Sequence, residues 1–391
     1  MYKVRTFNQI ALKGLERFPR DSFEVGSDMP DPHAILLRSH QLGDEQLTPG
    51  LRAVARAGAG VNNVPVDFLT SRGVVVFNTP GANANSVKEL VLAALLMSAR
   101  DVHGGLNYVA SLGDIDAADE LNRRVEADKK RFQGEELFGK TLGVVGLGAI
   151  GALVAEAGLR LGMKVLGYDP AISVEAAWRL PSDVERMENL PTLFSRSDYV
   201  TLHVPLLDDT RHLINDESLK AFRPGTVLLN FARQEVVDEA ALAKALQAQR
   251  IGRYFSDFPS VTLRSFTNVL ATPHLGASTG EAEENCAVMA ADQLIDFLVN
   301  GNIRNSVNFP TIALERTAGL RVAIANRNVP RMLGQVLSVL AKANINVIDM
   351  INKSRGDVAY NLIDVAGTVS AELIAEMNRI DSVINVRVFD H

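Results

Sequence analysis

The sequence has little cysteine, few aromatic residues and no excess of basic charge. Of its 391 residues one is cysteine, one is tryptophan, and 6% are aromatic. The single Cys286 has no partner within this chain, which excludes an internal disulfide. The 40 lysines and arginines are outnumbered by 46 aspartates and glutamates, so the formal net charge is -6. This balance argues against a general nucleic-acid binder, because that role needs a basic surface.

Long apolar runs are also absent. No stretch approaches the roughly 20 apolar residues of a membrane span, and residues 1–4 lack the basic start and apolar run of a secretory signal. Together with the lone cysteine, these features predict a cytoplasmic protein. The hydrophobic fraction of 47% and the charged fraction of 22% are typical of a folded globular protein. At roughly 150 residues per domain, the length predicts two or three domains.

Two series of short apolar runs alternate with helical and glycine-bearing stretches. The first series covers residues 34–76, and the second covers residues 141 to about 273. Strands that alternate with helices in this way imply right-handed crossovers, so the sequence predicts an α/β fold with two doubly wound parallel-sheet (Rossmann-like) domains. Between the two series, residues 86–100 have the pattern of a buried helix that begins with a capping box of Ser86 and Glu89.

The C-terminal part of the chain has a different pattern. A helical stretch over residues 281–300 and a polar, proline-bearing linker over residues 302–317 precede a separate unit of residues 319–391. The apolar runs of that unit predict the order β-α-β-β-α-β, which is a small ferredoxin-like sandwich. The highly charged residues 114–138 have two interpretations that stay open: a solvated surface excursion, or an arm used in subunit contact.

A glycine motif predicts a dinucleotide site. Gly146, Gly148 and Gly151 directly follow an apolar strand and open a helix, which allows a tight turn, close approach to a pyrophosphate and an anion at the helix N-terminus. The next strand ends in Asp169, 18 residues beyond Gly151. A carboxylate there accepts hydrogen bonds from the ribose hydroxyls and repels a 2′-phosphate, so the sequence favours NAD over NADP.

Three further residues suit the oxidation of a hydroxy acid. Such a reaction needs a base for the hydroxyl proton and a cation for the carboxylate. His274 can be the base, because imidazole titrates near neutral pH, and Arg233 can be the cation. Asp257 suits the nicotinamide end of the cofactor. Taken singly, each has an ordinary structural explanation, namely a loop histidine, a surface ion pair and a turn; their value lies in the combination.

The motifs together resemble the D-isomer-specific 2-hydroxyacid dehydrogenases, and within that family the phosphoglycerate dehydrogenases with a C-terminal ACT domain. The resemblance covers nearly the whole chain. It rests on residues 56–64 (Arg-Ala-Gly-Ala-Gly-Val-Asn-Asn-Val), 78–83 (Asn-Thr-Pro-Gly-Ala-Asn), 203–206 (His-Val-Pro-Leu), 230–233 (Asn-Phe-Ala-Arg) and 273–279 (Pro-His-Leu-Gly-Ala-Ser-Thr), and on the glycine motif.

The resemblance implies three domains and a set of site residues. A discontinuous substrate-binding domain of residues 1–95 and 285–310, an NAD-binding domain of residues 96–284 and an ACT domain of residues 318–391 are expected. Arg233 would bind the substrate carboxylate, and His274 would act as acid and base. The expected cofactor-binding residues are Gly146, Gly148, Ala149, Ile150, Gly151, Asp169, His203, Val204, Pro205, Phe231, Ala232, Asp257, Gly276 and Ala277. The expected substrate-binding residues are Arg38, Arg56, Gly58, Ala59, Asn83 and Arg233; no metal site is expected.

One departure from the family concerns the histidine. Members usually carry a glutamate shortly after the aspartate, which hydrogen-bonds the histidine and favours its protonated form. Here no carboxylate occurs between Asp257 and His274, and Glu281, Glu283 and Glu284 lie only downstream. Something else must therefore orient His274, or it works less well. The departure keeps a second class of function open, a dinucleotide-sensing protein without turnover.

The implied ACT domain suggests an amino-acid effector. In serine-sensitive relatives, polar residues before a proline-containing turn and at the start of the second strand hold the ligand. Asn328 and Asn346 match these positions, whereas Asn326 replaces the usual histidine and Arg331 stands where glycine is common. L-Serine is therefore the expected effector, and a purely structural or dimerising module is the alternative.

The resemblance favours NAD-dependent oxidation of D-3-phosphoglycerate in serine biosynthesis. Reduction of glyoxylate or hydroxypyruvate and oxidation of 4-phosphoerythronate are the nearest alternatives, because the shared machinery recognises only a carboxylate and a hydroxyl. Members of this family commonly pair through their cofactor domains, so a homodimer or homotetramer is expected.

Overall fold

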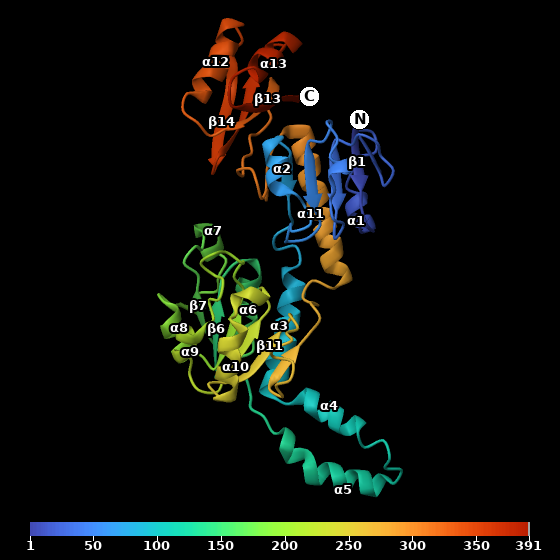
Figure 1. The fold of residues 1–391 in the computed structure, drawn as a ribbon, viewed down its shortest axis with the longest axis vertical. Coiled ribbons are helices and arrows are strands. Elements are labelled where there is room, and N and C mark those ends of the chain that lie inside the picture. Colours follow the sequence, from blue (N-terminus) through green and yellow to red (C-terminus); the bar gives the residue numbers. More distant parts are fainter. Residues whose placement is uncertain (390–391) are drawn as a thin grey trace. The chain divides into compact units, whose positions relative to one another are not determined.

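The computed structural model describes residues 1–389, and its contacts divide the chain into two compact units. The first unit contains Met1–Asn83 and the chain from Gly280 onward, and the second contains Ala84–Thr279. Asp390 and His391 belong to the expected C-terminal domain but lie outside the described residues. Figure 1 shows the course of the chain. Over residues 1–389, no helix has both the length and the apolar character to cross a membrane.

A five-stranded parallel sheet in the order β2-β1-β3-β4-β5 forms the N-terminal part of the first unit. α1 and α11 cover one face and α2 covers the other, which explains why the central strands are apolar almost throughout. The elements are β1 (Tyr2–Thr6), α1 (Leu12–Leu15), β2 (Phe23–Gly26), β3 (Ala34–Leu37), β4 (Ala53–Arg56), α2 (Val66–Ser71), β5 (Val75–Phe77) and α11 (Gly280–Asn300), with a short 3-10 turn at Asp44–Gln46.

The C-terminal part of the first unit is a four-stranded antiparallel sheet in the order β14-β15-β13-β16. Two helices, α12 and α13, pack on one face around a core of valine, isoleucine and leucine side chains. The bounds are β13 (Leu320–Arg327), α12 (Met332–Lys342), β14 (Val347–Arg355), β15 (Val358–Val365), α13 (Ala371–Asn378) and β16 (Val383–Phe389). The predicted β-α-β-β-α-β order is confirmed.

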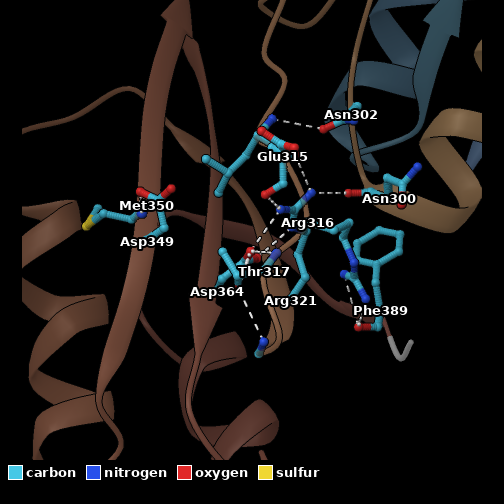
Figure 2. A network of polar contacts seen from close by, with 12 residues as sticks. Asn300, Asn302, Glu315, Arg316, Thr317, Arg321, Asp349, Met350, Asp364 and Phe389 are labelled. Atoms are coloured by element: carbon cyan, nitrogen blue, oxygen red, sulfur yellow. Dashed lines mark hydrogen bonds and ion pairs between the residues drawn. The ribbon is translucent and has the colours of Figure 1, made fainter.

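Arg321 joins this sheet to the chain that precedes it (Figure 2). The side chain is fully buried, and its Nε and Nη2 atoms contact the buried carboxylate of Asp364 at 2.6 and 2.9 Å. Its other donors reach the carbonyl oxygens of Asn300, Leu314 and Glu315. All five N–H donors of the guanidinium are thus used, which offsets the lost hydration of a buried charge. The stretch predicted as a linker is therefore fixed to β13 and β15 at its C-terminal end.

The second unit is built on a seven-stranded parallel sheet in the order β12-β11-β10-β9-β6-β7-β8. α3 and α6 pack on one face, and α8, α9 and α10 pack on the other, so the predicted doubly wound architecture is confirmed. The elements are α3 (Ala84–Ala99), β6 (Thr141–Val145), α6 (Ala149–Arg160), β7 (Lys164–Tyr168), α7 (Val174–Ala177), β8 (Val184–Arg186), α8 (Leu190–Arg196), β9 (Tyr199–Leu202), α9 (Asp216–Lys220), β10 (Thr226–Asn230), α10 (Glu239–Gln247), β11 (Ile251–Ser256) and β12 (Val269–Ala271), with a 3-10 turn at Gln234–Val236.

One local prediction in this unit is wrong. The helix expected to begin at Ser86 begins at Ala84, so Ser86 lies inside its first turn and is not the N-cap. The Ser86 hydroxyl instead donates to the carbonyl oxygen of Gly276 at 2.7 Å. A serine followed three residues later by glutamate has the same sequence pattern whether the serine is an N-cap or lies in the first turn. Only the hydrogen-bond partner of the serine distinguishes the two positions.

The charged stretch is a helical hairpin. α4 (Val102–Ala110) and α5 (Ala118–Asp128) are followed by a 3-10 turn at Lys129–Phe132. Tyr108 joins these elements, because its ring packs at a tilt against Phe132 and its hydroxyl donates to Asp128 at 2.7 Å. α4 exposes the apolar side chains of Val102, Leu106 and Val109. The two interpretations made from the sequence, a surface excursion and a subunit arm, both remain open.

Candidate active site

Six loops of the second unit leave the sheet at one edge. β12, β11, β10, β9, β6 and β7 are neighbours in that order, and all these pairs are parallel. Their carboxyl ends therefore meet at the same edge, which is where doubly wound folds bind ligands. The sequence-predicted Gly146, Asp169, His203, Arg233 and His274 all lie in these loops. The fold thus collects at one edge residues that are far apart in the chain.

The glycine loop between β6 and α6 has a distinct structural reason for each glycine. Gly146 has a φ of +89°, a conformation that other residues rarely adopt. A Cβ on Gly151 would lie 1.9 Å from the carbonyl oxygen of Gly146, so only glycine allows the helix to pack this close to the turn. A Cβ on Gly148 would meet nothing within 4 Å. Packing within the unit therefore explains the first and third glycines but not Gly148.

Asp169 follows β7 and supports the glycine loop. One carboxylate oxygen accepts a hydrogen bond from the Leu147 amide at 2.8 Å, and the other accepts one from the Ala171 amide at 2.9 Å. The side chain is partly exposed, and each carboxylate oxygen has a further lone pair. Asp169 can therefore hold the loop and still accept hydrogen bonds from two ribose hydroxyls.

The loop after β9 presents its main chain, not the imidazole of His203, to the glycine loop. The carbonyl oxygen of His203 would lie 2.6 Å from a Cβ on Gly146. Its ring turns inward, where Nε2 shares a 2.9 Å hydrogen bond with the buried Thr201 hydroxyl and Nδ1 is buried without a partner. Burial lowers the pKa of His203 to about 3. The ring is therefore a neutral part of the core.

Arg233 lies in the turn that follows β10. Asn230 is fully buried and organises this turn: its Nδ2 donates to the Arg233 carbonyl oxygen at 2.9 Å, and its Oδ1 accepts from the Ala232 amide at 3.1 Å. Phe231 and Ala232 are buried, whereas the Arg233 side chain is exposed. Within residues 1–389, the guanidinium forms only the bond from Nη1 to the neighbouring Ala232 carbonyl, so its other donors can bind a carboxylate.

Asp257, directly after β11, holds the loop that carries His274. Its carboxylate is 3% exposed and accepts bonds of 2.7 Å from the Thr272 hydroxyl and from the amides of Leu275 and Gly276. The three donors lie on both sides of His274 in the sequence. The carbonyl oxygen of Asp257 also accepts from the His274 amide. The expected contact of Asp257 with the nicotinamide stays a prediction, and its role in the loop is new.

His274 itself has an unusual backbone and an exposed side chain. Its φ is +57°, in the left-handed region that residues with a Cβ adopt at an energetic cost and that is enriched at functional sites. Among the hydrogen bonds of residues 1–389, none reaches the imidazole ring. The ring instead packs against Phe258, with ring centroids 5.1 Å apart and an interplanar angle of 63°.

The first unit places the two candidate phosphate ligands at the carboxyl edge of its own sheet. Arg38 follows β3 and Arg56 ends the neighbouring β4. The Nε atom of Arg56 donates to the Arg38 carbonyl oxygen, and its Nη1 donates to the Gly60 carbonyl oxygen. Arg38 forms a 2.7 Å ion pair with Glu283 at the start of α11. The neighbouring Gly58, Ala59 and Asn83 are partly or fully exposed.

The chain is similar to known proteins over most of its length. Residues 107–276 match the family model "D-isomer specific 2-hydroxyacid dehydrogenase, NAD binding domain". A D-3-phosphoglycerate dehydrogenase of Haemophilus influenzae is 33% identical over 384 residues, which cover 94% of this chain and 89% of that protein. The chain belongs to the D-isomer specific 2-hydroxyacid dehydrogenases.

Two further relatives bear on how far this likeness extends. A D-3-phosphoglycerate dehydrogenase of Methanocaldococcus jannaschii is 34% identical over 346 residues and 85% of this chain, but the chain spans only 62% of that protein's length. The NAD⁺-bound 3-phosphoglycerate dehydrogenase of Entamoeba histolytica has the same fold, with a TM-score of 0.61 and 25% identity over 80% of this chain and 99% of that one.

The second unit is accordingly the NAD-binding domain of a 2-hydroxyacid dehydrogenase. The space beside Gly148 fits this cofactor, because main chain without a Cβ there leaves room for a pyrophosphate at the N-terminus of the 12-residue α6. The partly exposed carboxylate of Asp169 fits the ribose hydroxyls. Individual contacts of Ala149, Ile150, Val204, Pro205, Gly276 and Ala277 with NAD stay predictions.

Three residues that shape this dehydrogenase site were not singled out from the sequence. Thr272 and Ser86 hold the two ends of the histidine loop, through Asp257 and Gly276 respectively, and Phe258 packs on the histidine. Thr272 lies in a short segment beside the motif and could have been suspected. Ser86 is 190 positions from Gly276, so no local pattern could have shown the contact.

Replacing Gly148 by alanine tests the cofactor site. Because the added Cβ meets no protein atom, Gly148→Ala should fold as the wild type does, but it should weaken NADH binding roughly tenfold or more, since the methyl group takes the space of the pyrophosphate. Thermal unfolding and NADH titration measure the two effects. Gly105→Ala, in α4, is the matched control, which should leave NADH binding unchanged. Unchanged NADH affinity in Gly148→Ala would contradict the placement of the cofactor.

His203 predicts a pH dependence of stability. In the unfolded chain its imidazole takes a proton near its usual pKa of about 6.5, whereas in the fold it stays neutral down to about pH 3. The free energy of unfolding is therefore unaffected above pH 7 and falls as the pH drops, by about 2 kcal/mol at pH 5 from this group. Urea unfolding at pH 7.5 and 5.0 should show a smaller loss for His203→Gln than for the wild type. His103→Gln, on the exposed hairpin, should behave as the wild type.

Proposed function

We propose that this chain oxidises D-3-phosphoglycerate to 3-phosphohydroxypyruvate with NAD, the first step of the phosphorylated route to L-serine. The observation that carries the proposal is the combination of Arg233 and His274 at one sheet edge with Arg38 and Arg56 at the carboxyl ends of β3 and β4. The first pair suits any 2-hydroxy acid, and the second pair suits a phosphate. The likeness to curated phosphoglycerate dehydrogenases at 33–34% identity supports the same substrate.

The catalytic roles follow from the chemistry of each group. Arg233 binds the substrate carboxylate through guanidinium donors that have no partner in the described part of the chain, and so sets the orientation of C2. His274 takes the proton of the C2 hydroxyl through its exposed imidazole. Bound NAD supplies the acceptor for the hydride that leaves C2. In the reverse direction, His274 returns the proton to the carbonyl oxygen.

The phosphate is assigned to the first unit. Arg38 and Arg56 are neighbours through the bond from the Arg56 Nε to the Arg38 carbonyl oxygen. The partner of Arg38, Glu283, is 42% exposed, so a substrate phosphate can replace it as the counter-ion. A dianionic phosphate offers more acceptor oxygens than a carboxylate, which favours the exchange. Gly58 and Ala59 add main-chain groups beside these arginines.

Steady-state kinetics with competing substrates tests the proposal. Purified protein should reduce NAD with D-3-phosphoglycerate when the product is removed, and should be less efficient with D-lactate, D-glycerate and 4-phosphoerythronate. Arg38→Met should raise KM for D-3-phosphoglycerate roughly ten- to a hundredfold and leave KM for NAD unchanged. The control is Arg17→Met, which removes another surface ion pair of the same unit.

The outcomes of this assay separate the alternatives. Activity on a rival substrate with none on D-3-phosphoglycerate would keep the dehydrogenase and discard the substrate. Steady NADH production no greater than that of His274→Ala, with every substrate, would favour a dinucleotide-sensing protein instead. The reason to include that class is that no hydrogen-bonded partner is found for the His274 ring among residues 1–389.

The C-terminal sheet is proposed to be an ACT domain that binds L-serine. Its antiparallel β-α-β-β-α-β order supports this. Asn328 is exposed before α12, with its Nδ2 bonded to the Gly356 carbonyl oxygen at 3.1 Å, and Asn346 is exposed before β14. Asn326 is buried and bonded to Asn361, so it is not available to a ligand in this arrangement. Arg331 has a φ of +74°, which accounts for the glycine common there in relatives.

Adding L-serine tests this assignment. Millimolar L-serine should lower the rate and raise the thermal unfolding midpoint, because a ligand that binds only the folded state stabilises it. Asn346→Ala should lose both effects, whereas Asn378→Ala, on the exposed side of α13, should keep them. If serine changes neither the rate nor the midpoint of the wild type, the module is structural or dimerising.

The domain limits and the assembly belong to the same proposal. We assign substrate binding to residues 1–95 and 285–310, cofactor binding to residues 96–284 and regulation to residues 318–391. A homodimer or homotetramer is expected for a dehydrogenase of this family, and the apolar side chains exposed on α4 are consistent with a subunit contact. A cytoplasmic location remains the prediction made from the sequence.

A further inference from the structure

The loop after β11 lacks the carboxylate that relatives carry about five residues after the aspartate, and it supplies an aromatic neighbour to His274. Phe258 directly follows Asp257 and is half-buried. Its ring lies edge-to-face with the His274 imidazole, at a centroid distance of 5.1 Å and an angle of 63°. Edge-to-face pairs of this kind are favourable and depend on orientation. Among residues 1–389 this is the one ring contact of His274, and no hydrogen bond reaches the imidazole.

The segment that carries Phe258 is itself held in place. The Phe258 amide donates to the hydroxyl of the buried Ser256 at 3.1 Å. Two positions further on, the Ser260 hydroxyl donates to Glu239 at 2.6 Å and accepts from the amides of Thr262 and Leu263. The phenyl ring therefore projects from a turn that is fixed at both ends. Such a ring can restrain a neighbour because it cannot move away freely.

The backbone of His274 is restrained from the other side. Asp257 accepts hydrogen bonds from Thr272, Leu275 and Gly276, and the loop bends at His274 with a φ of +57°. These bonds set where the Cα of His274 lies, but they leave the two side-chain torsions undetermined. Phe258, the residue next to this clamp in the chain, contacts the ring that those torsions turn. Backbone and side chain of the histidine are thus restrained by adjacent residues.

We propose that Phe258 is the positioning residue for His274 in this chain, in the role that a hydrogen-bonded carboxylate has in its relatives. The inference rests on the proposed function, because it takes His274 as the base that receives the hydroxyl proton. Phe258 acts only through His274 and touches no reacting atom. It orients the imidazole, so its loss should lower kcat while cofactor binding stays intact.

The replacement of a carboxylate by a phenyl ring separates orientation from charge. A carboxylate beside imidazole both orients it and stabilises its protonated form, whereas a neutral aromatic ring gives mainly orientation. Removal of Phe258 should therefore change the rate without moving the pH dependence of kcat/KM. Removal of a carboxylate partner should move the acidic limb of that dependence to lower pH. The pH profile thus distinguishes the two kinds of partner.

Four variants of the full chain test the proposal. Phe258→Leu keeps the apolar volume and removes the aromatic ring, so kcat should fall roughly ten- to a hundredfold with KM for NAD unchanged within about twofold. Phe258→Tyr should restore most of the rate. Phe266→Leu removes a phenylalanine from the same connection between β11 and β12. Phe266 packs against the hydrophobic cluster under α8, α9 and α10, so this variant should leave kcat unchanged. Glu239→Gln removes the carboxylate closest in the hydrogen-bond network to this turn.

Each outcome decides the inference. A normal kcat in Phe258→Leu would overturn it, and so would an equal loss in Phe258→Leu and Phe258→Tyr, which would indicate general damage to the turn. If Glu239→Gln moves the acidic limb of the profile to lower pH and Phe258→Leu does not change the rate, Glu239 is the partner of His274. The expected result is a rate loss in Phe258→Leu alone, with the same pH profile as the wild type.

A measurement without turnover separates failure of this inference from failure of the proposed function. In protein labelled with ¹³C at histidine Cε1, the resonance of His274 is identified by its absence in His274→Asn. The ring current of Phe258 should displace this resonance, and Phe258→Leu should shift it while the other histidine resonances stay in place. No shift would contradict the contact, whatever substrate the enzyme uses. A clear shift in a protein that oxidises none of the substrates would leave the contact intact and refute the function.

Discussion

The buried carboxylate of Asp257 is the interaction on which the arrangement of the candidate active site depends. At 3% exposure it accepts bonds of 2.7 Å from Thr272, Leu275 and Gly276. Hydrogen bonds from two amides and a hydroxyl replace the water that the carboxylate loses on burial. They also compensate for the strained backbone at His274, since a left-handed residue persists only where its surroundings determine it. Asp257, at the end of β11, therefore fixes the loop that follows β12.

Asp257 can reach the loop of His274 because β10, β11 and β12 are parallel and end at the same level of the sheet. Ser256 at the end of β11 pairs with Asn230 of β10 on one side and with Ala271 of β12 on the other. The loops that follow these three residues carry Arg233, Asp257 and His274, so their main chains start side by side. Asn230 organises the first loop and Asp257 the last, each through bonds to main-chain groups. The side chains of Arg233 and His274, proposed to act in catalysis, are thereby presented by loops whose backbones are fixed by buried polar residues.

The sequence predicted more of the fold than of the polar contacts within the site. The β-α-β-β-α-β order predicted for residues 319–391 is confirmed, because the apolar residues of elements such as α12 and β16 follow the period of a helix and of a half-buried strand. Strands β8 and β11 have weak local sequence patterns: β8 has three residues and little burial, and glycine and arginine interrupt β11. Gly146, Asp169, Arg233 and His274 were predicted from motifs. The inward turn of the His203 ring, the bond of Ser86 to Gly276 and the clamp at Asp257 depend on tertiary partners that no local pattern contains.

The chain lacks the carboxylate that is usual beside the histidine in its family, and the fold can replace only one of the two effects of such a partner. A carboxylate partner gives imidazole a direction and a stabilised charge. Direction can come from any rigid neighbour, and here a phenyl ring at 5.1 Å extends from a turn anchored at Ser256 and Ser260. Charge cannot come from that ring. A base for hydroxyl oxidation starts in its neutral form and becomes imidazolium as it takes the proton, so His274 without a carboxylate partner keeps its direction and loses the stabilisation of that charge. The histidine can therefore stay oriented as a base without the carboxylate, provided that its loop stays fixed by Asp257.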